Sequence, residues 1–150
     1  MAKTDYMALA FEEAEAAAAR GEVPIGAVVV EAATGRVLAR AGNEVEAAND
    51  PTAHAELLAL RGAGELLGAP RLVDCDLYVT LEPCPMCASA TSFARIRRLY
   101  YGAPDPKGGG VEHGARVFEQ TTCHHKPDVY AGIQERRASE LLKTFFRARR

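Results

Sequence analysis

The sequence predicts an α/β protein with a three-layer α/β/α architecture, in which helices cover both faces of a five-stranded mixed sheet. Two β-rich runs, at 23–30 and 37–41, flank a turn at 33–36 and predict a hairpin. Downstream of this hairpin, strand-like segments alternate with helical patterns. Such alternation is typical of a sheet that is covered on both sides.

The first two expected helices have recognisable ends. Thr4 or Asp5 can cap a first helix whose apolar residues recur at helical spacing, and Gly21 ends it. Asp50-Pro51-Thr52 predicts the start of a second helix. The leucines of this second helix lie on or near one face, namely Leu57, Leu58, Leu60, Leu66 and Leu67.

The second half of the chain continues the alternation. The expected elements are a central strand at 77–81, a helix from Pro85 to about Arg95, a strand at 98–101, a strand at 129–133 and a helix at 138–149. A glycine-rich loop occupies 105–110, and we expect one short helix within 111–127. No internal repeat or linker is visible, so we expect one domain over residues 1–150.

The composition is that of an ordinary globular protein, with 48% hydrophobic and 25% charged residues. The first 20 residues are acidic and alanine-rich, unlike a secretory signal. No apolar run approaches the roughly 20 residues that are needed to cross a bilayer. We therefore expect a cytoplasmic protein without a membrane partner.

Four cysteines in a cytoplasmic protein indicate metal binding or catalysis more than disulfides. Cys84 and Cys87 are three positions apart, which suits a shared metal ion. Cys75 and Cys123 are isolated, and each is expected to be a buried small residue.

The charge is unevenly distributed along the chain. Residues 136–150 contain six basic residues and only Glu140 as an acidic one, so they carry +5. Because the whole chain carries −2, residues 1–135 carry −7. A basic tail on an acidic body suggests a polyanionic partner. A solvated helix end is an equally good interpretation, since cations are favoured near helix C-termini.

Two short motifs carry the chemistry: His54-Ala55-Glu56 and Pro83-Cys84-Pro85-Met86-Cys87. A catalytic zinc takes three protein ligands and leaves its fourth position open, and one imidazole with two thiolates provides that set. Both motifs are expected where a helix begins, and a helix N-terminus favours thiolate over thiol.

Glu56 follows His54 by two residues, so on a helix the two side chains point in different directions. Glu56 is then badly placed to bind the same ion but can reach a water beside it, which favours a proton shuttle. The alternative is a structural zinc with Cys75 or Cys123 as the fourth ligand, and this alternative gives Glu56 no task. The combined signature is that of zinc nucleobase deaminases.

From Glu22 onward the chain resembles the bacterial tRNA-specific adenosine deaminases of the cytidine deaminase-like superfamily. The matching stretches are Glu22-Val23-Pro24-Ile25-Gly26-Ala27-Val28, Asp50-Pro51-Thr52-Ala53-His54-Ala55-Glu56, Leu77-Tyr78-Val79-Thr80-Leu81-Glu82-Pro83-Cys84, Gly102-Ala103-Pro104-Asp105-Pro106-Lys107 and Phe145-Phe146-Arg147-Ala148-Arg149-Arg150. The stretches around the metal ligands are shared with free-base guanine and cytosine deaminases. The last two stretches are more particular to the tRNA enzymes.

The resemblance implies a role for each matching position. His54, Cys84 and Cys87 would hold one Zn²⁺ per subunit, and Glu56 would act as the acid and base. Asn43 would lie beside the base or ribose of the substrate.

Further substrate contacts are implied by the same resemblance. Pro24 and Ile25 would lie against the base, and Asp105 and Lys107 would meet the flanking nucleotides. The residues implied to grip the anticodon loop are Phe145, Phe146, Arg147, Arg149 and Arg150. Unpaired bases are read by such edge contacts, aromatic stacking and arginine planes.

The activity implied is hydrolytic deamination of adenosine to inosine at the wobble position of a tRNA anticodon, in a homodimer whose subunits both build each pocket. One alternative is a deaminase of a free nucleobase or nucleoside, such as guanine, cytosine or a related heterocycle. A more distant alternative is a non-catalytic, zinc-containing RNA-binding protein.

Some residues depart from the family pattern or have a second interpretation. Thr91 places a hydroxyl where the family has an apolar side chain, although it could bond within its own helix. The stretch 108–113 is looser than is typical. Asn43 could be a turn residue, and at most one of the adjacent Phe145 and Phe146 can face the core squarely. The residues given no role are taken as surface histidines, namely His113, His124 and His125.

Overall fold

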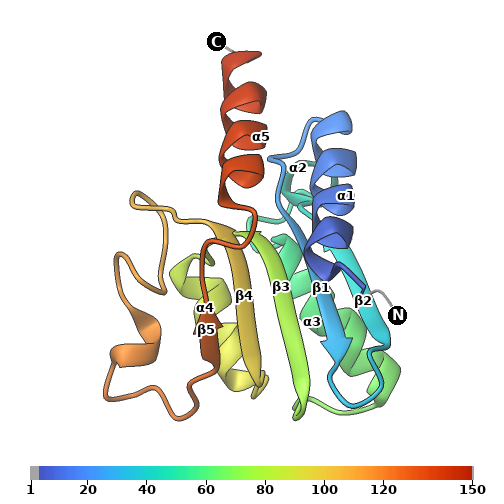
Figure 1. Ribbon diagram of the computed structural model, residues 1–150, viewed down its shortest axis with the longest axis vertical. Helices are drawn as coiled ribbons and strands as arrows, with labels where there is room; N and C mark the ends of the chain where they lie inside the picture. Colours follow the sequence, from blue (N-terminus) through green and yellow to red (C-terminus); the bar gives the residue numbers. More distant parts are fainter. Residues whose placement is uncertain (1–3, 150) are drawn as a thin grey trace.

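The computed structural model describes residues 4–149 and contains a five-stranded sheet in the order β2-β1-β3-β4-β5 (Figure 1). The strands are β1 (Gly26–Glu31), β2 (Val37–Gly42), β3 (Cys75–Leu81), β4 (Arg98–Ala103) and β5 (Asp128–Tyr130). β1 pairs antiparallel with both β2 and β3, whereas β3 and β4, and β4 and β5, pair in parallel. The predicted mixed sheet, its N-terminal hairpin and the central place of β3 are confirmed.

Helices cover both faces of this sheet (Figure 1). They are α1 (Tyr6–Ala19), α2 (Val45–Ala48), α3 (Ala55–Leu67), α4 (Pro85–Phe93) and α5 (Glu135–Arg147), with a 3₁₀ turn η1 at Val117–Glu119. α3 and α4 bury one face of the sheet, and α1 and the start of α5 pack on the other. The predicted three-layer α/β/α architecture is therefore confirmed.

Small residues let these layers approach closely. Gly26 begins β1, and a Cβ atom at this position would collide with the backbone of α1 at Ala10 and Ala14. Alanines dominate the buried faces of α1 and α3, so both helices lie close to the valine-rich strand β1. No helix within residues 4–149 is long and apolar enough to span a membrane.

The second helix begins later than the sequence predicts. Asp50 does not cap a helix; its Oδ1 accepts hydrogen bonds from the backbone N–H of Thr52, at 2.8 Å, and from the Thr52 hydroxyl, at 2.7 Å. This closes a turn, and α3 starts only at Ala55. The short helix α2, just before that turn, was not predicted, because four residues give no periodic pattern.

The other differences are shifts of boundaries. β5 is confined to Asp128–Tyr130, and α5 begins at Glu135, three residues before the predicted start. α4 ends at Phe93 instead of about Arg95. The expected short helix in 111–127 is the turn η1. Asp5 caps α1 as predicted, since its side chain accepts a hydrogen bond from the N–H of Ala8.

Candidate active site

The two chemical motifs both lie at helix N-termini, beside the carboxyl end of β3. His54 occupies the N-cap position of α3, and Cys84 occupies that of α4. Both residues have extended backbone conformations that turn the chain into the helix. Pro85 follows at the first position of α4, where its missing N–H loses no helical bond. The predicted placement at two helix starts is confirmed.

The side chains of His54, Cys84 and Cys87 converge on one point. The Nδ1 atom of His54 lies 3.6 Å from the Sγ of Cys84 and 3.5 Å from the Sγ of Cys87. All three ligand atoms lie within 4.8 Å of one another. A tetrahedral zinc with ordinary bond lengths separates a nitrogen and a sulfur ligand by about 3.6 Å. The donor set and its spacing are thus compatible with zinc.

Within residues 4–149, this is the one group of His, Cys, Asp or Glu side chains with metal-binding spacing. Cys75 and Cys123 do not belong to it. Cys75 is buried at the opposite end of β3, as predicted for a small core residue. Cys123 is half-buried, and its thiol lies 3.1 Å from the carbonyl oxygen of His125. A four-ligand structural site with either cysteine is therefore not supported.

The electrostatics of the group favour a cation. A side-chain hydrogen bond from Cys87 lowers the pKa of Cys84 to about 4 and raises the pKa of Cys87. The hydrogen bond with Cys84 in turn raises the pKa of His54. The lowered pKa of Cys84 favours its thiolate, which is the form of cysteine that binds a metal ion.

Glu56, in the first turn of α3, is buried beside this group with 3% of its surface exposed. Its Oε1 has no hydrogen-bond partner among the described residues. Burial raises the pKa of Glu56 to about 7. An unpaired buried carboxylate oxygen is expensive in free energy unless a ligand or water completes it. The position suits a group that exchanges a proton with a bound molecule.

Asn43 connects β1 with the start of α3. Its side-chain Oδ1 accepts a hydrogen bond from the N–H of Ala55, at 2.8 Å, and its own N–H donates to the carbonyl oxygen of Ile25, at 3.2 Å. The side chain is buried. Asn43 therefore lies next to both Ile25, after the buried Pro24, and the helix that carries Glu56.

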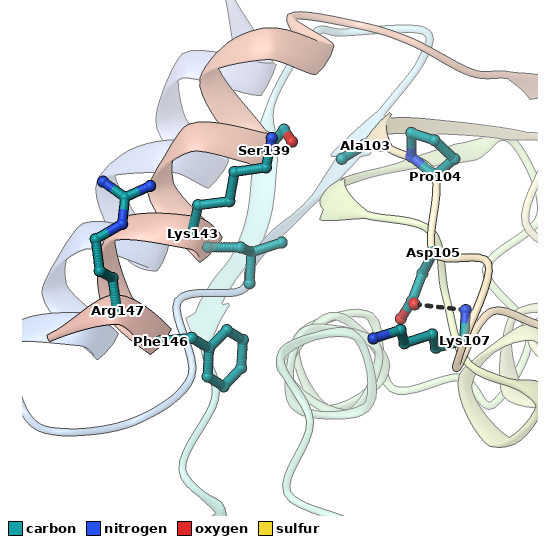
Figure 2. Close-up of a pocket in the computed structure, with 9 residues that line it drawn as sticks. Ala103, Pro104, Asp105, Lys107, Ser139, Lys143, Phe146 and Arg147 are labelled. Atoms are coloured by element: carbon teal, nitrogen blue, oxygen red, sulfur yellow. Dashed lines mark hydrogen bonds between the residues drawn. The ribbon is translucent and has the colours of Figure 1, made fainter. Parts of the chain in front are cut away.

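A cavity of about 600 Å³ opens between α5 and the loop after β4 (Figure 2). Asp105 and Lys107 lie on the loop side, and Phe146 and Arg147 on the helix side. Lys143 adds a third cation to the wall. The structure thus brings together predicted substrate residues from two segments that are 40 positions apart.

The remaining C-terminal candidates lie elsewhere. Phe145 is buried, with 7% of its surface exposed, and the Arg149 guanidinium lies over its ring at 3.6 Å. Phe145 therefore faces the core and Phe146, 46% exposed, faces outward. The structure does not place Phe145 or Arg149 in the cavity wall, and Arg150 lies outside the described residues.

Several contacts near the site were missed by sequence reasoning. His113 is not a free surface residue, because its Nδ1 lies 2.7 Å from the Oε1 of buried Glu82. His125 Nε2 lies 2.7 Å from the carbonyl oxygen of Ile96. The sequence offered only the position of Glu82, two residues before Cys84, as a signal. Thr91 bonds the carbonyl oxygen of Cys87 within α4 at 2.8 Å, as one of its interpretations predicted.

Comparisons with known proteins agree with this fold and site. A family model described as MafB19-like deaminase matches residues 1–150. The tRNA-specific adenosine deaminase of Agrobacterium fabrum is 60% identical over 148 residues, which cover 99% of this chain and 96% of that protein.

Two solved structures are also similar to this chain. A chain from work on A-to-I editing by tRNA:A34 deaminases at the wobble position of transfer RNA has a TM-score of 0.89 and 61% identity, covering 91% of this chain and 98% of that one. A guanine deaminase from Nitrosomonas europaea has a TM-score of 0.80 at 25% identity, covering 93% of this chain and 81% of that one.

The sheet order and the His-x-Glu and Cys-x-x-Cys helix starts define a deaminase of the cytidine deaminase-like fold. The chain belongs to the MafB19-like deaminases and, among them, to the family of the tRNA-specific adenosine deaminases. The resemblance stated from the sequence is confirmed.

Proposed function

We propose that this protein hydrolytically deaminates adenosine to inosine at the wobble position of a tRNA anticodon. The observation that carries the proposal is the buried Oε1 of Glu56, which has no hydrogen-bond partner within residues 4–149 and lies beside the converging side chains of His54, Cys84 and Cys87. The names of relatives, among them a tRNA-specific adenosine deaminase at 60% identity, support the choice of substrate. The expected cytoplasmic location stays a prediction.

In this proposal His54, Cys84 and Cys87 hold one zinc ion per subunit. Bound zinc supplies Lewis acidity, so that water becomes a nucleophile at neutral pH. Two thiolates balance the double charge of the ion. The protein's own contribution is to hold the three ligands rigidly at two helix starts and to keep Glu56 pointing at the reacting atoms.

Glu56 moves the protons. Its Oε1 takes a proton from the attacking water and delivers it to the adenine ring nitrogen N1, while the C6–O bond forms. Glu56 then takes the proton of the hydroxyl group now bound to C6 and passes it to the departing amine as the C6–N bond breaks, which leaves the C6 carbonyl of inosine. The products are inosine and ammonia, so water is consumed and no oxidant or reductant is needed. A carboxyl group whose pKa lies near the working pH suits both proton transfers.

The substrate contacts of this proposal are those that the family resemblance implies, and the positions of some of these residues support them. Asn43, Pro24 and Ile25 would contact the target base or ribose, and Asn43 bonds both Ala55, next to Glu56, and Ile25. Asp105 and Lys107, across the cavity from Phe146 and Arg147, would contact the neighbouring nucleotides. Exposed aromatic rings and cations around a groove suit splayed bases and their phosphates. Two subunits building each pocket, as the family resemblance implies, remain part of this proposal.

An assay of the purified protein on four substrates tests the proposal: a tRNA anticodon stem-loop with adenosine at the wobble position, free adenosine, guanine and cytosine. We expect inosine and ammonia in equal amounts from the stem-loop, and loss of activity after chelation that zinc restores. Guanine deaminase activity is the second candidate, because a guanine deaminase shares the fold with a TM-score of 0.80. Faster turnover of guanine than of the stem-loop would favour that candidate.

A further inference from the structure

We propose that Glu82 is a positioning residue, whose buried carboxylate holds the 105–113 loop in the shape that presents Asp105 and Lys107 to the substrate. The inference rests on the proposed function for what the loop contacts. How the loop is held is independent of that function, because the hydrogen bonds of Glu82 alone establish it.

The Glu82 carboxylate gathers backbone groups from both ends of the loop. Its Oε1 accepts hydrogen bonds from the N–H of Asp105, at 2.9 Å, and from the His113 ring, at 2.7 Å. Its Oε2 accepts three more, from the N–H groups of Val111, Glu112 and His113, at 3.0–3.1 Å. The Glu82 side chain has no exposed surface. One side chain thus satisfies four backbone donors in a segment without regular structure.

These partners fix the chemical form of both side chains. A carboxylate only accepts hydrogen bonds, so the Nδ1 atom of His113 must carry its proton. Burial acts to raise the pKa of Glu82, but the hydrogen bonds from Asp105, His113 and Val111 outweigh it and hold the pKa below its ordinary value. The ionised form is therefore the one that the loop selects.

The same loop lies directly against the candidate metal centre. The N–H of Gly110 donates to the carbonyl oxygen of Pro83, at 2.8 Å, and a Cβ atom on Gly110 would lie 2.5 Å from the nitrogen of Pro85. A Cβ atom on Gly109 would collide with Glu82 itself. Gly109 and Gly110 therefore have no room for a side chain, and this lets the loop approach Glu82 and Pro85 closely. The loop joins the Cys84 motif on one side and the cavity on the other.

Asp105 is held in place twice. Its N–H bonds Glu82, and its own Oδ1 accepts hydrogen bonds from the N–H groups of Lys107 and Gly108, at 3.2 and 3.0 Å. Figure 2 shows the bond from Lys107 at the loop side of the cavity. Because Lys107 follows this turn, releasing the Asp105 backbone from Glu82 releases the wall that faces Phe146.

The variant Glu82→Gln tests the proposal with little change of shape. All partners of both oxygens are donors, so the new NH₂ group must face a donor wherever it points. It is best tolerated at the Oε1 position, where a neutral His113 can turn acceptor. The Asp105 bond is then lost, and the three bonds to the other oxygen weaken, because a neutral amide accepts more weakly than a carboxylate. The matched control is Asp76→Asn, a buried carboxylate at the opposite end of β3 that pairs with Arg97 at 2.7 Å.

We expect Glu82→Gln to bind zinc like the wild type and to raise KM for the stem-loop about tenfold, with kcat changed less than about threefold. Hydrogen exchange at the amides of Asp105, Val111, Glu112 and His113 should accelerate relative to amides of β1. Asp76→Asn should leave both readouts near wild type.

Two outcomes would overturn the proposal. Unchanged exchange at those four amides means that Glu82 does not hold the loop. Loss of zinc, or a fall in kcat at constant KM, means that Glu82 acts on the metal centre instead. If the wild type itself leaves the stem-loop unmodified, the proposed function fails, and the exchange measurement still decides whether Glu82 orders the loop.

Discussion

The side-chain oxygen of Asn43 accepts a hydrogen bond from the backbone N–H of Ala55, at 2.8 Å, and so caps the helix that carries Glu56. His54 occupies the N-cap position but makes no side-chain capping bond, because its ring turns toward Cys84 and Cys87. Asn43, 12 positions before Ala55, therefore provides the cap that His54 cannot.

Asn43 caps α3 and is also expected to contact the substrate, so its substitution should have two separable effects. Asn43→Ala leaves the Ala55 N–H unpaired and should lower the free energy of unfolding by about 1 kcal/mol or more. Asn43→Asp keeps an acceptor oxygen and should restore most of that stability, but it lacks the amide NH₂ that a base or ribose would accept from. Urea unfolding and stem-loop kinetics separate the two effects. Full activity of Asn43→Asp would show that the amide does not contact the substrate.

Substitutions of the two adjacent phenylalanines of α5 should have different effects, one on substrate binding and the other on stability. Phe146→Ala removes an exposed ring from the cavity and should raise KM for the stem-loop while leaving the melting temperature nearly unchanged. Phe145→Ala opens a cavity in the core and should cost about 3 kcal/mol of stability. Thermal unfolding together with kinetics provides the comparison. Equal effects of the two substitutions on KM would contradict the assignment of Phe146 to the substrate face.

Substitutions of two neighbouring glycines in the 105–113 loop should also differ in their effects. A Cβ atom at Gly109 collides with buried Glu82, whereas at Gly108 it meets only the Asp105 carboxylate, at 3.1 Å. Gly109→Ala should therefore impair stem-loop binding much more than Gly108→Ala. Titration of a fluorescent stem-loop against both variants measures this difference. Similar affinities would argue against a tightly packed loop.

The stability of the protein should depend on pH through Glu82. The fold holds the pKa of Glu82 below its ordinary value, so the ionised side chain stabilises the folded state. That stabilisation is complete above about pH 4.3, the ordinary pKa of glutamate. It is lost as the pH falls through the lower folded-state value. Urea unfolding between pH 7 and 3 should show a shallower loss for Glu82→Gln, and parallel curves would contradict this role.

The parts of the site that neighbouring residues define could be predicted from the sequence. His54 and Cys84 could be assigned because each motif starts a helix and the residue spacing reveals the ligand types. The mixed sheet followed from the order of its strands, which is also local information. The assignment of Phe146, rather than Phe145, to the surface needed the structure, since adjacent residues of one helix give no preference.

Long-range contacts could not be predicted. Glu82 bonds backbone N–H groups up to 31 positions away, in a loop whose sequence has no period, so the sequence shows only a glutamate before a proline. The wrong start of α3 has a related cause. Asp50-Pro51-Thr52 satisfies the local rule for a helix start, but the Asp50 side chain closes a turn with Thr52, and the cap comes from Asn43.

Metal content and turnover of Glu56→Ala, measured beside the wild type, test the central claim most directly. Glu65→Ala, at an exposed position of α3, is the matched control. We predict one zinc per chain in all three proteins, wild-type inosine formation in the control, and a fall of about three orders of magnitude in Glu56→Ala. Turnover of Glu56→Ala near the wild-type rate, or purified wild-type protein without zinc, would contradict the account.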